Sequence, residues 1–171
     1  MHIHSMIQLM KKIETRKNRN SSAWACLLFL FTWGCMLSGA QAEAAPRAIE
    51  NFCEDWQFHF GDLEQAEQPS FDDTSWRTLN VPHDWSIEQP MDPKAPGGSS
   101  TGYRRGGIGW YRKTFELPKA AEGQKVFIDF DGVYMNSQVW INGHLLGFRP
   151  FGYIGFRYDL TPHLNADGEN V

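Results

Sequence analysis

Short runs in which apolar and polar residues alternate recur along the chain from residue 52 onward, separated by residues that favour turns. An alternating run predicts a β-strand with one buried face, because successive side chains of a strand point to opposite sides. The apolar periodicity of an amphipathic helix is scarce in the same region. The pattern therefore predicts an all-β sandwich or barrel, with strands in the runs 52–60, 76–81, 109–117, 125–130, 139–146 and 154–160.

The clearest local signal is the pair Asn142 and Gly143, which stands between two apolar runs. A type I′ turn requires positive φ at both central residues, and Asn and Gly adopt such angles most readily. The pair therefore predicts a tight hairpin. In an earlier run Val126, Ile128 and Phe130 share one face, which predicts that this face belongs to the core.

The segment 89–107 has the composition of a long loop. Pro82 ends the strand before it, since proline lacks the N–H that a central strand needs. Loops of this length without structure of their own are usually functional or disordered. The glycines and prolines of the segment are Pro90, Pro93, Pro96, Gly97, Gly98, Gly102, Gly106 and Gly107.

The first 42 residues have the layout of a secretory signal peptide. A basic region precedes the apolar run 23–37, and small residues follow in an Ala-x-Ala arrangement that ends at Ala42. We therefore predict a signal peptide at 1–42, a short linker at 43–50 and one domain at 51–171, in a periplasmic or secreted protein. The basic residues are Lys11, Lys12, Arg16, Lys17 and Arg19.

Two other interpretations of the N-terminus stay open. The apolar run would anchor the protein in a membrane if it were not cleaved, although it is shorter than the roughly 20 residues of a spanning helix. Cys35 would carry a lipid if it belonged to a lipobox, although Thr32 and Trp33 replace the Leu and the small residue of that motif. The flanking chemistry favours cleavage over both.

The charge of the predicted mature chain disfavours nucleic acid as a partner. Residues 43–171 carry 11 Lys and Arg against 19 Asp and Glu, a net charge of -8, whereas phosphate binding needs clustered cations. Only Cys53 lies beyond residue 42, so no internal disulfide is predicted. The histidines lack metal-ligand spacing, and the Gly-rich loop lacks a phosphate-binding Gly-Lys-Ser/Thr motif. We therefore predict no metal and no cofactor.

Aromatic and planar polar side chains gather in the predicted loops, which is the composition that a sugar site needs. The apolar faces of sugar rings pack on flat aromatic rings, and sugar hydroxyls pair with Asp, Asn or Arg. We therefore predict a carbohydrate ligand and a substrate-binding set at one end of the sandwich, made of Asp84, Trp85, Arg104, Arg149 and Tyr153.

Structural interpretations stand beside these predictions. Asp84 would cap a turn through neighbouring backbone, as Asx residues often do. His83 is expected as a polar residue at a strand edge rather than as a ligand contact. The tryptophans in strand positions are expected in the core, and they are Trp76, Trp110 and Trp140.

Five motifs occur in a fixed order along the chain. They are Val81-Pro82-His83-Asp84-Trp85, Gly109-Trp110-Tyr111-Arg112-Lys113, Phe130-Asp131-Gly132-Val133, Val139-Trp140-Ile141-Asn142-Gly143 and Tyr158-Asp159-Leu160-Thr161. Together they closely resemble the sugar-binding domain of glycoside hydrolase family 2, over about residues 50–171. The resemblance implies a jelly-roll-like β-sandwich of the galactose-binding-domain-like class. In family members an immunoglobulin-like sandwich and a (β/α)-barrel with the catalytic glutamates follow.

The resemblance also implies a function. The family hydrolyses β-glycosides with retention, and the motifs look most like those of β-galactosidases. In these enzymes the polar residue two positions after the strand-ending proline reaches the sugar in the barrel's active site, and the matching residue is Asp84. Phe151 stands where some β-galactosidases carry an Asp beside a bound cation, so the resemblance implies no metal here.

The carboxylates of the chain do not supply a catalytic pair of their own. The adjacent pair Asp72 and Asp73 lies in a turn-like context and is interpreted as structural. We therefore expect a fragment of a larger enzyme that is inactive without its downstream barrel. Two alternatives stay open, a secreted lectin-like module without catalysis and a sandwich whose aromatic residues only fill its core.

Overall fold

The computed structural model describes residues 6–17 and 47–171, which contain strands and short 3₁₀-helices only. This confirms the all-β prediction. The strands are β1 (Met6–Lys17), β2 (Ile49–Glu50), β3 (Trp56–Phe60), β4 (Arg77–Leu79), β5 (Gly109–Arg112), β6 (Phe115–Glu116), β7 (Gln124–Tyr134), β8 (Ser137–Ile141), β9 (His144–Arg149), β10 (Phe156–Asp159) and β11 (Glu169–Asn170). The 3₁₀-helices are η1 (Gly98–Thr101), η2 (Lys119–Ala121) and η3 (Thr161–His163).

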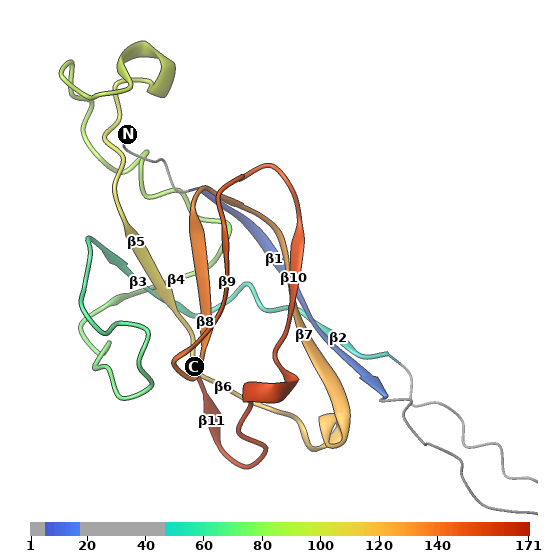
Figure 1. The fold of residues 1–171 in the computed structure, drawn as a ribbon. Helices are drawn as coiled ribbons and strands as arrows, with labels where there is room; N and C mark the ends of the chain where they lie inside the picture. The colour runs from blue at the N-terminus through green and yellow to red at the C-terminus, as the bar shows by residue number, and fades with distance from the viewer. Residues whose placement is uncertain (1–5, 18–46) are drawn as a thin grey trace, which may run out of the picture.

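The strands are arranged as a sandwich (Figure 1). One layer is a four-stranded sheet in the order β10-β7-β1-β2, and the opposite side holds a three-stranded sheet in the order β4-β3-β5. The hairpin β8-β9 and the short pair β11-β6 are separate two-stranded sheets. Long loops join the strands at the two ends, and the segments before β5 and between β9 and β10 lie at the same end.

Strand β7 supplies the centre of the hydrophobic core. Val126, Ile128 and Phe130 are exposed by only 2%, 5% and 6%, which confirms the predicted core face. They belong to one buried cluster with Trp56 from β3 and Ile141 from β8. The alternation of the sequence is thus converted into contact between the two layers, because only every second side chain of β7 points inward.

The predicted hairpin is confirmed. Strands β8 and β9 pair antiparallel, and the two residues between them have positive φ, 51° at Asn142 and 80° at Gly143. The Asn142 amide group also donates to the carbonyl of His163 at 2.8 Å and to the side chain of Asn170 at 2.9 Å. The turn therefore fixes the last residues of the chain as well as the hairpin.

The predicted strand at 109–117 is divided in two. β5 pairs with β3, whereas β6 pairs with β11, and Lys113 and Thr114 lie between the two elements. The chain changes its hydrogen-bonding partner at this point, so one apolar run serves two sheets. An alternating pattern specifies which side chains face inward, but it does not specify a change of neighbour.

The strand β1 lies within the segment predicted as a signal peptide. It pairs antiparallel with β7 from Met6 opposite Tyr134 to Lys17 opposite Gln124. The apolar run 23–37, Cys35 and the cleavage position after Ala42 lie outside the described residues, so the signal peptide stays a prediction. No helix in the described ranges is long and apolar enough to span a membrane.

The hairpin turn provides a test of the fold. Replacing Gly143 by Ala places a Cβ on a residue with φ of 80° and 3.3 Å from the Gln68 side chain. We expect Gly143→Ala to lower the free energy of unfolding by about 1 kcal/mol, measured by urea denaturation. Gly143→Asn is the matched control and should lose less, since Asn tolerates positive φ. Equal losses in both variants would contradict this account of the turn.

Candidate functional site

Three residues on neighbouring strands form a row across the β4-β3-β5 sheet. Phe58 on β3 lies directly opposite Arg77 on β4 and directly opposite Tyr111 on β5. The guanidinium carbon of Arg77 lies 5.3 Å from the centre of the Phe58 ring, and the ring of Tyr111 lies 4.8 Å from it. The Arg77–Phe58–Tyr111 row is therefore built by strand register, with a buried aromatic ring at its centre.

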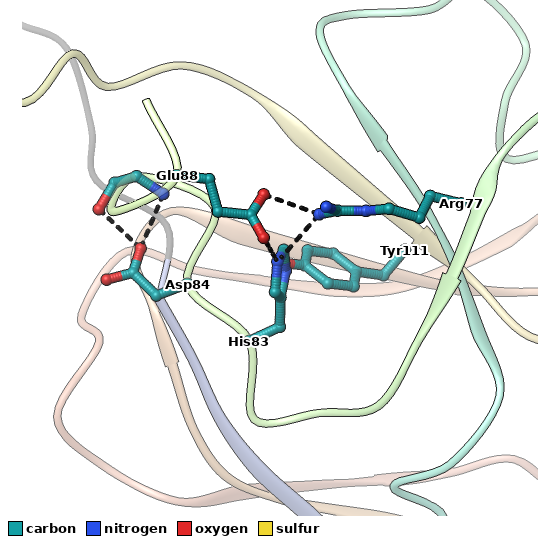
Figure 2. A network of polar contacts seen from close by, with 6 residues as sticks. Arg77, His83, Asp84, Glu88 and Tyr111 are labelled. Carbon is teal, nitrogen blue, oxygen red and sulfur yellow. Dashed lines mark hydrogen bonds and ion pairs between the residues drawn. The ribbon is translucent and has the colours of Figure 1, made fainter. Parts of the chain in front are cut away.

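His83 lies over this row (Figure 2). Its ring is 4.8 Å from that of Phe58, its Nδ1 is 2.8 Å from the Tyr111 hydroxyl, and its Nε2 is 3.1 Å from Oε1 of Glu88. Nε2 also lies 3.2 Å from Nη2 of Arg77, and the tautomer of the ring decides which nitrogen donates and which accepts. The His83 side chain is 13% exposed. His83 thus ties the segment after Pro82 to the sheet.

Glu88 closes the network from the loop side. Its second oxygen accepts a hydrogen bond from Arg77 at 2.7 Å. This bond is the largest influence on the Glu88 carboxyl and, together with His83, holds its pKa below the usual value. Burial acts in the opposite direction on the Tyr111 hydroxyl and raises its pKa, with the nearby charges of Asp84 and Glu88 adding to the effect. Tyr111 therefore stays protonated over the physiological pH range.

Asp84 follows His83 directly and lies beside this network. Its Oδ1 accepts hydrogen bonds from the backbone N–H of Ser86 at 2.9 Å and from the Ser86 hydroxyl at 2.6 Å. This is the turn-capping geometry expected of an Asx residue. Both of these hydrogen bonds use Oδ1, and in Figure 2 the other oxygen of the labelled Asp84 has no dashed line to any residue drawn. The carboxylate is held by one oxygen and can accept through the other.

Trp85, the next residue, is fully buried, with 0% of its surface exposed. Its ring lies 4.7 Å from that of Phe60. A Cβ at Gly109 would come within 2.8 Å of the indole Nε1, so a glycine is required beneath it. The structure therefore places Trp85 as a packing residue under the turn rather than as a ring presented to a sugar.

The remaining predicted site residues lie in two separate places. Arg104 donates from its guanidinium to the carbonyl oxygen of Gln89 and so closes the Gly-rich loop upon itself. Tyr153 is 74% exposed, and its ring contacts that of Tyr134 at 5.2 Å. Arg149 lies over the rings of two residues on β10, Phe156 and Tyr158. The loops share one end of the sandwich (Figure 1), but no hydrogen bond, ion pair or ring contact recorded among described residues joins Asp84 to Arg149 or Tyr153.

We found no set of metal ligands in the part of the chain that the structure describes. No group of three His, Cys, Asp or Glu side chains there could hold a metal ion. The stacked pair His144 and His163, with ring centres 4.5 Å apart, lies on the hairpin and on η3 without a third ligand. The arrangement around Asp84 can bind hydroxyl groups, because a carboxylate oxygen accepts hydrogen bonds.

Sequence reasoning missed Arg77, Glu88 and Tyr111 and expected His83 only as a polar edge residue. These residues are separated by 5 to 28 positions from His83. Arg77 and Glu88 lie in none of the five motifs, and the motif that contains Tyr111 supported only the family resemblance. Their proximity follows from the strand register that places Arg77 and Tyr111 on either side of Phe58. Knowledge of that register would have been needed to predict these neighbours, and the alternation of apolar and polar residues does not specify register between distant strands.

The sequence matches a known protein family over most of its length. Residues 49–171 match the sugar binding domain of glycosyl hydrolases family 2. The chain belongs to this family. Among curated relatives, β-galactosidase BoGH2A of Bacteroides ovatus is 54% identical over 127 residues, covering 74% of the chain and 15% of that protein. A putative β-glucuronidase of Formosa agariphila is 45% identical over 155 residues, covering 91% of the chain and 14% of that protein.

Solved structures agree with the family assignment. A β-glycosidase from Bacteroides vulgatus superposes with a TM-score of 0.67 at 52% identity, covering 70% of this family 2 chain and 16% of that structure. The chain thus spans about 15% of the length of the curated β-galactosidase it matches and corresponds to its sugar-binding domain. The fold class predicted from the motifs is confirmed by these relatives.

The hydrogen bonds of Glu88 with Arg77 and His83 predict that the stability of the fold depends on pH in the acid range. The pKa of Glu88 lies below its unfolded value of about 4.3, so its pairing stabilises the fold above that pH and is lost as pH falls through the folded pKa. We expect Glu88→Gln to lower the free energy of unfolding at pH 7 by at most about 1 kcal/mol, because the pair is partly exposed. The difference should shrink as the pH is lowered from 7 to about 3, because the carboxylate becomes protonated as pH falls through its folded pKa.

Urea denaturation at both pH values measures this effect. Glu122→Gln, on an exposed turn, is the matched control and should leave the unfolding free energy unchanged at both. A Glu88→Gln deficit of equal size at pH 7 and near pH 3 would show that the carboxylate charge does not stabilise the network.

Proposed function

We propose that this domain forms one wall of the substrate pocket in a retaining β-glycosidase of the β-galactosidase type, which removes terminal β-linked sugars. Family membership supports this proposal, as do the activities named for the relatives from Bacteroides ovatus and Formosa agariphila. The two catalytic carboxylates come from a downstream barrel, and the domain contributes hydroxyl recognition. The chain alone is therefore inactive in hydrolysis.

The observation that carries the proposal is the half-fixed carboxylate of Asp84. Ser86 holds Oδ1 by two hydrogen bonds, so the side chain is oriented before any ligand arrives. A sugar hydroxyl that donates to the other oxygen would gain a charge-assisted hydrogen bond without the cost of ordering this side chain. The His83 network holds the same segment against the sheet from the other side.

The proposal also includes export of the protein from the cytoplasm. The basic, apolar and small-residue segments of 1–42 support secretion to the periplasm or beyond, where polymeric and oligomeric glycans are met. A carbohydrate is accordingly the proposed partner, together with the chain's own catalytic barrel.

A lectin-like module is the second candidate, favoured by one observation. The loop between β9 and β10 exposes Phe151 and Tyr153 by 56% and 74%, with ring centres 5.6 Å apart, and exposed rings are platforms for sugars. This candidate requires the chain itself to bind glycans measurably. Calorimetry of the chain against a panel of galactosides and glucuronides tests it, and flat titrations count against it.

The reading frame beyond the codon for Val171 is the first test of the hydrolase proposal. A frame that continues into a barrel with two glutamates at strand ends supports it, and the longer protein should then hydrolyse an aryl β-galactoside or β-glucuronide. A longer protein that binds neither substrate and hydrolyses neither would refute the proposal.

Asp84 provides the residue-level test. In the hydrolase that contains this domain, we expect Asp84→Ala to lower kcat/KM by about 100-fold, which is about 3 kcal/mol, because the lost contact stabilises the bound transition state. Asp72→Ala is the matched control, since Asp72 caps Thr74 through the same two hydrogen bonds, at 3.1 and 2.6 Å, on a different loop. Both variants should fold.

Equal losses of kcat/KM in the two variants would reduce Asp84 to a turn cap, as would an unchanged rate in Asp84→Ala. Circular dichroism of both proteins separates either result from unfolding.

A further inference from the structure

Within residues 47–171, four arginines lie over an aromatic ring, with the guanidinium carbon 5.3 to 5.6 Å from the ring centre. Three of them also form an ion pair with a carboxylate, with nitrogen–oxygen distances of 2.6 to 2.9 Å. The three pairs are Arg77 with Glu88, Arg112 with Asp73 and Arg157 with Asp129. The fourth arginine, Arg149, forms no hydrogen bond or ion pair with any described residue. Among these four, only Arg149 therefore lacks an anionic partner.

The pair of Arg157 and Asp129 shows how a ring-stacked arginine of this protein binds a carboxylate. Nε of Arg157 donates to Oδ1 of Asp129 at 2.6 Å, and Nη2 donates to Oδ2 at 2.9 Å. One edge of a guanidinium and one carboxylate fit each other in this way, because two donors face two acceptors. The Nε of Arg149 is buried and has no acceptor among the described residues. A carboxylate is the group whose shape and charge fit this edge.

The Arg149 side chain is held in place by the core. Arg149 is the last residue of β9, and the rings of Phe156 and Tyr158 on β10 lie 5.4 and 5.6 Å from its guanidinium carbon. Phe156 is buried and stacks on Phe130 of β7 at 4.8 Å. The face of an aromatic ring attracts a cation but accepts no strong hydrogen bond from it. The guanidinium is therefore oriented before a ligand binds, while its donors stay available.

Two hydroxyl groups beside Arg149 are also buried without a partner. Ser137 lies directly opposite Arg149 in the β8-β9 hairpin, so both side chains are on the same face. The hydroxyl of Tyr158 lies against β9, since a Cβ at Gly147 would come within 2.7 Å of it. Neither hydroxyl has a hydrogen-bond partner in the described part of the chain. Three buried polar groups from three strands thus lie near one another, and all three can donate.

The chemistry of these groups calls for an anion rather than for water. A buried donor without an acceptor is destabilising, and a buried cation without a counter-ion is more so. Water could accept hydrogen bonds, but it would leave the charge of Arg149 uncompensated. A carboxylate supplies the charge and about four lone pairs, enough for the guanidinium edge and both hydroxyls. Arg149 as a whole is half-buried and Pro150 is exposed, so a small solute can reach the guanidinium from the rim of the core.

We propose that Arg149, Ser137 and Tyr158 form a carboxylate-binding site between the β8-β9 hairpin and β10. The carboxylate accepts from Nε and one terminal nitrogen of Arg149, and the two hydroxyl groups donate to its remaining lone pairs. The ligand is a free carboxylate ion or the carboxylate of an acidic sugar, which present the same chemistry to the three donors. The site stands directly before the loop that joins β9 to β10, and it requires neither Asp84 nor hydrolysis.

Titration of the chain with sodium acetate, followed by the NMR signal of the Arg149 Nε–H group, tests this site. Sodium chloride at the same ionic strength is the control solute. The Nε–H signal of Arg157 is the internal control, because Asp129 already binds that group. We expect the Arg149 signal to shift and to saturate, with half-saturation on the order of 10 mM for so small a ligand. The Arg157 signal should stay unchanged.

Two variants separate binding from packing, with affinity measured through the backbone amide signals of 147–149. Arg149→Lys keeps the charge but loses the planar pair of donors, and we expect it to weaken acetate binding at least about tenfold. Tyr158→Phe removes one buried hydroxyl and should weaken binding about threefold without lowering the melting temperature. A hydroxyl with a purely structural role would not change the affinity for acetate.

Glucuronate and galacturonate, compared with glucose and galactose, distinguish the two sources of the carboxylate. Tighter binding of the acidic sugars than of acetate identifies a glycan as the ligand, and equal or weaker binding identifies a free carboxylate ion. The neutral sugars should leave the Arg149 signal unchanged. The proposal is overturned if acetate does not saturate this signal, or if chloride or a neutral sugar shifts it equally. It is also overturned if Arg149→Lys binds acetate as tightly as the unsubstituted chain.

Discussion

The inward face of β7 is the constraint on which the other elements depend. Val126, Ile128 and Phe130 alternate along this strand, and each is almost fully buried. Their contact with Trp56 sets how β3 lies against the opposite layer. A slip of one residue in β7 would turn all three side chains to the other face, so the register of the sandwich is specified by the loss of buried apolar surface that any slip would cause.

The geometry of the candidate site follows from the register of the β4-β3-β5 sheet. Because Phe58 stands opposite both Arg77 and Tyr111, the sheet presents a guanidinium, a ring and a hydroxyl in one row. His83 binds to this row and carries Asp84 with it. The strands therefore hold the segment that carries Asp84, and Ser86 in the same loop orients the carboxylate itself, which suits a group that must meet a ligand without reorganising.

Local patterns in the sequence determined the elements whose physics is local. Asn142 and Gly143 predicted a hairpin because positive φ is intrinsic to these residue types, and alternation predicted the buried face of β7. The ordered motifs were sufficient to identify the family. Only the tertiary structure decided that His83 is the centre of a polar network, that Trp85 is buried and that the run 109–117 serves two sheets. These outcomes depend on which distant strands become neighbours, and a side chain's own residue type and spacing do not encode its partner across a sheet.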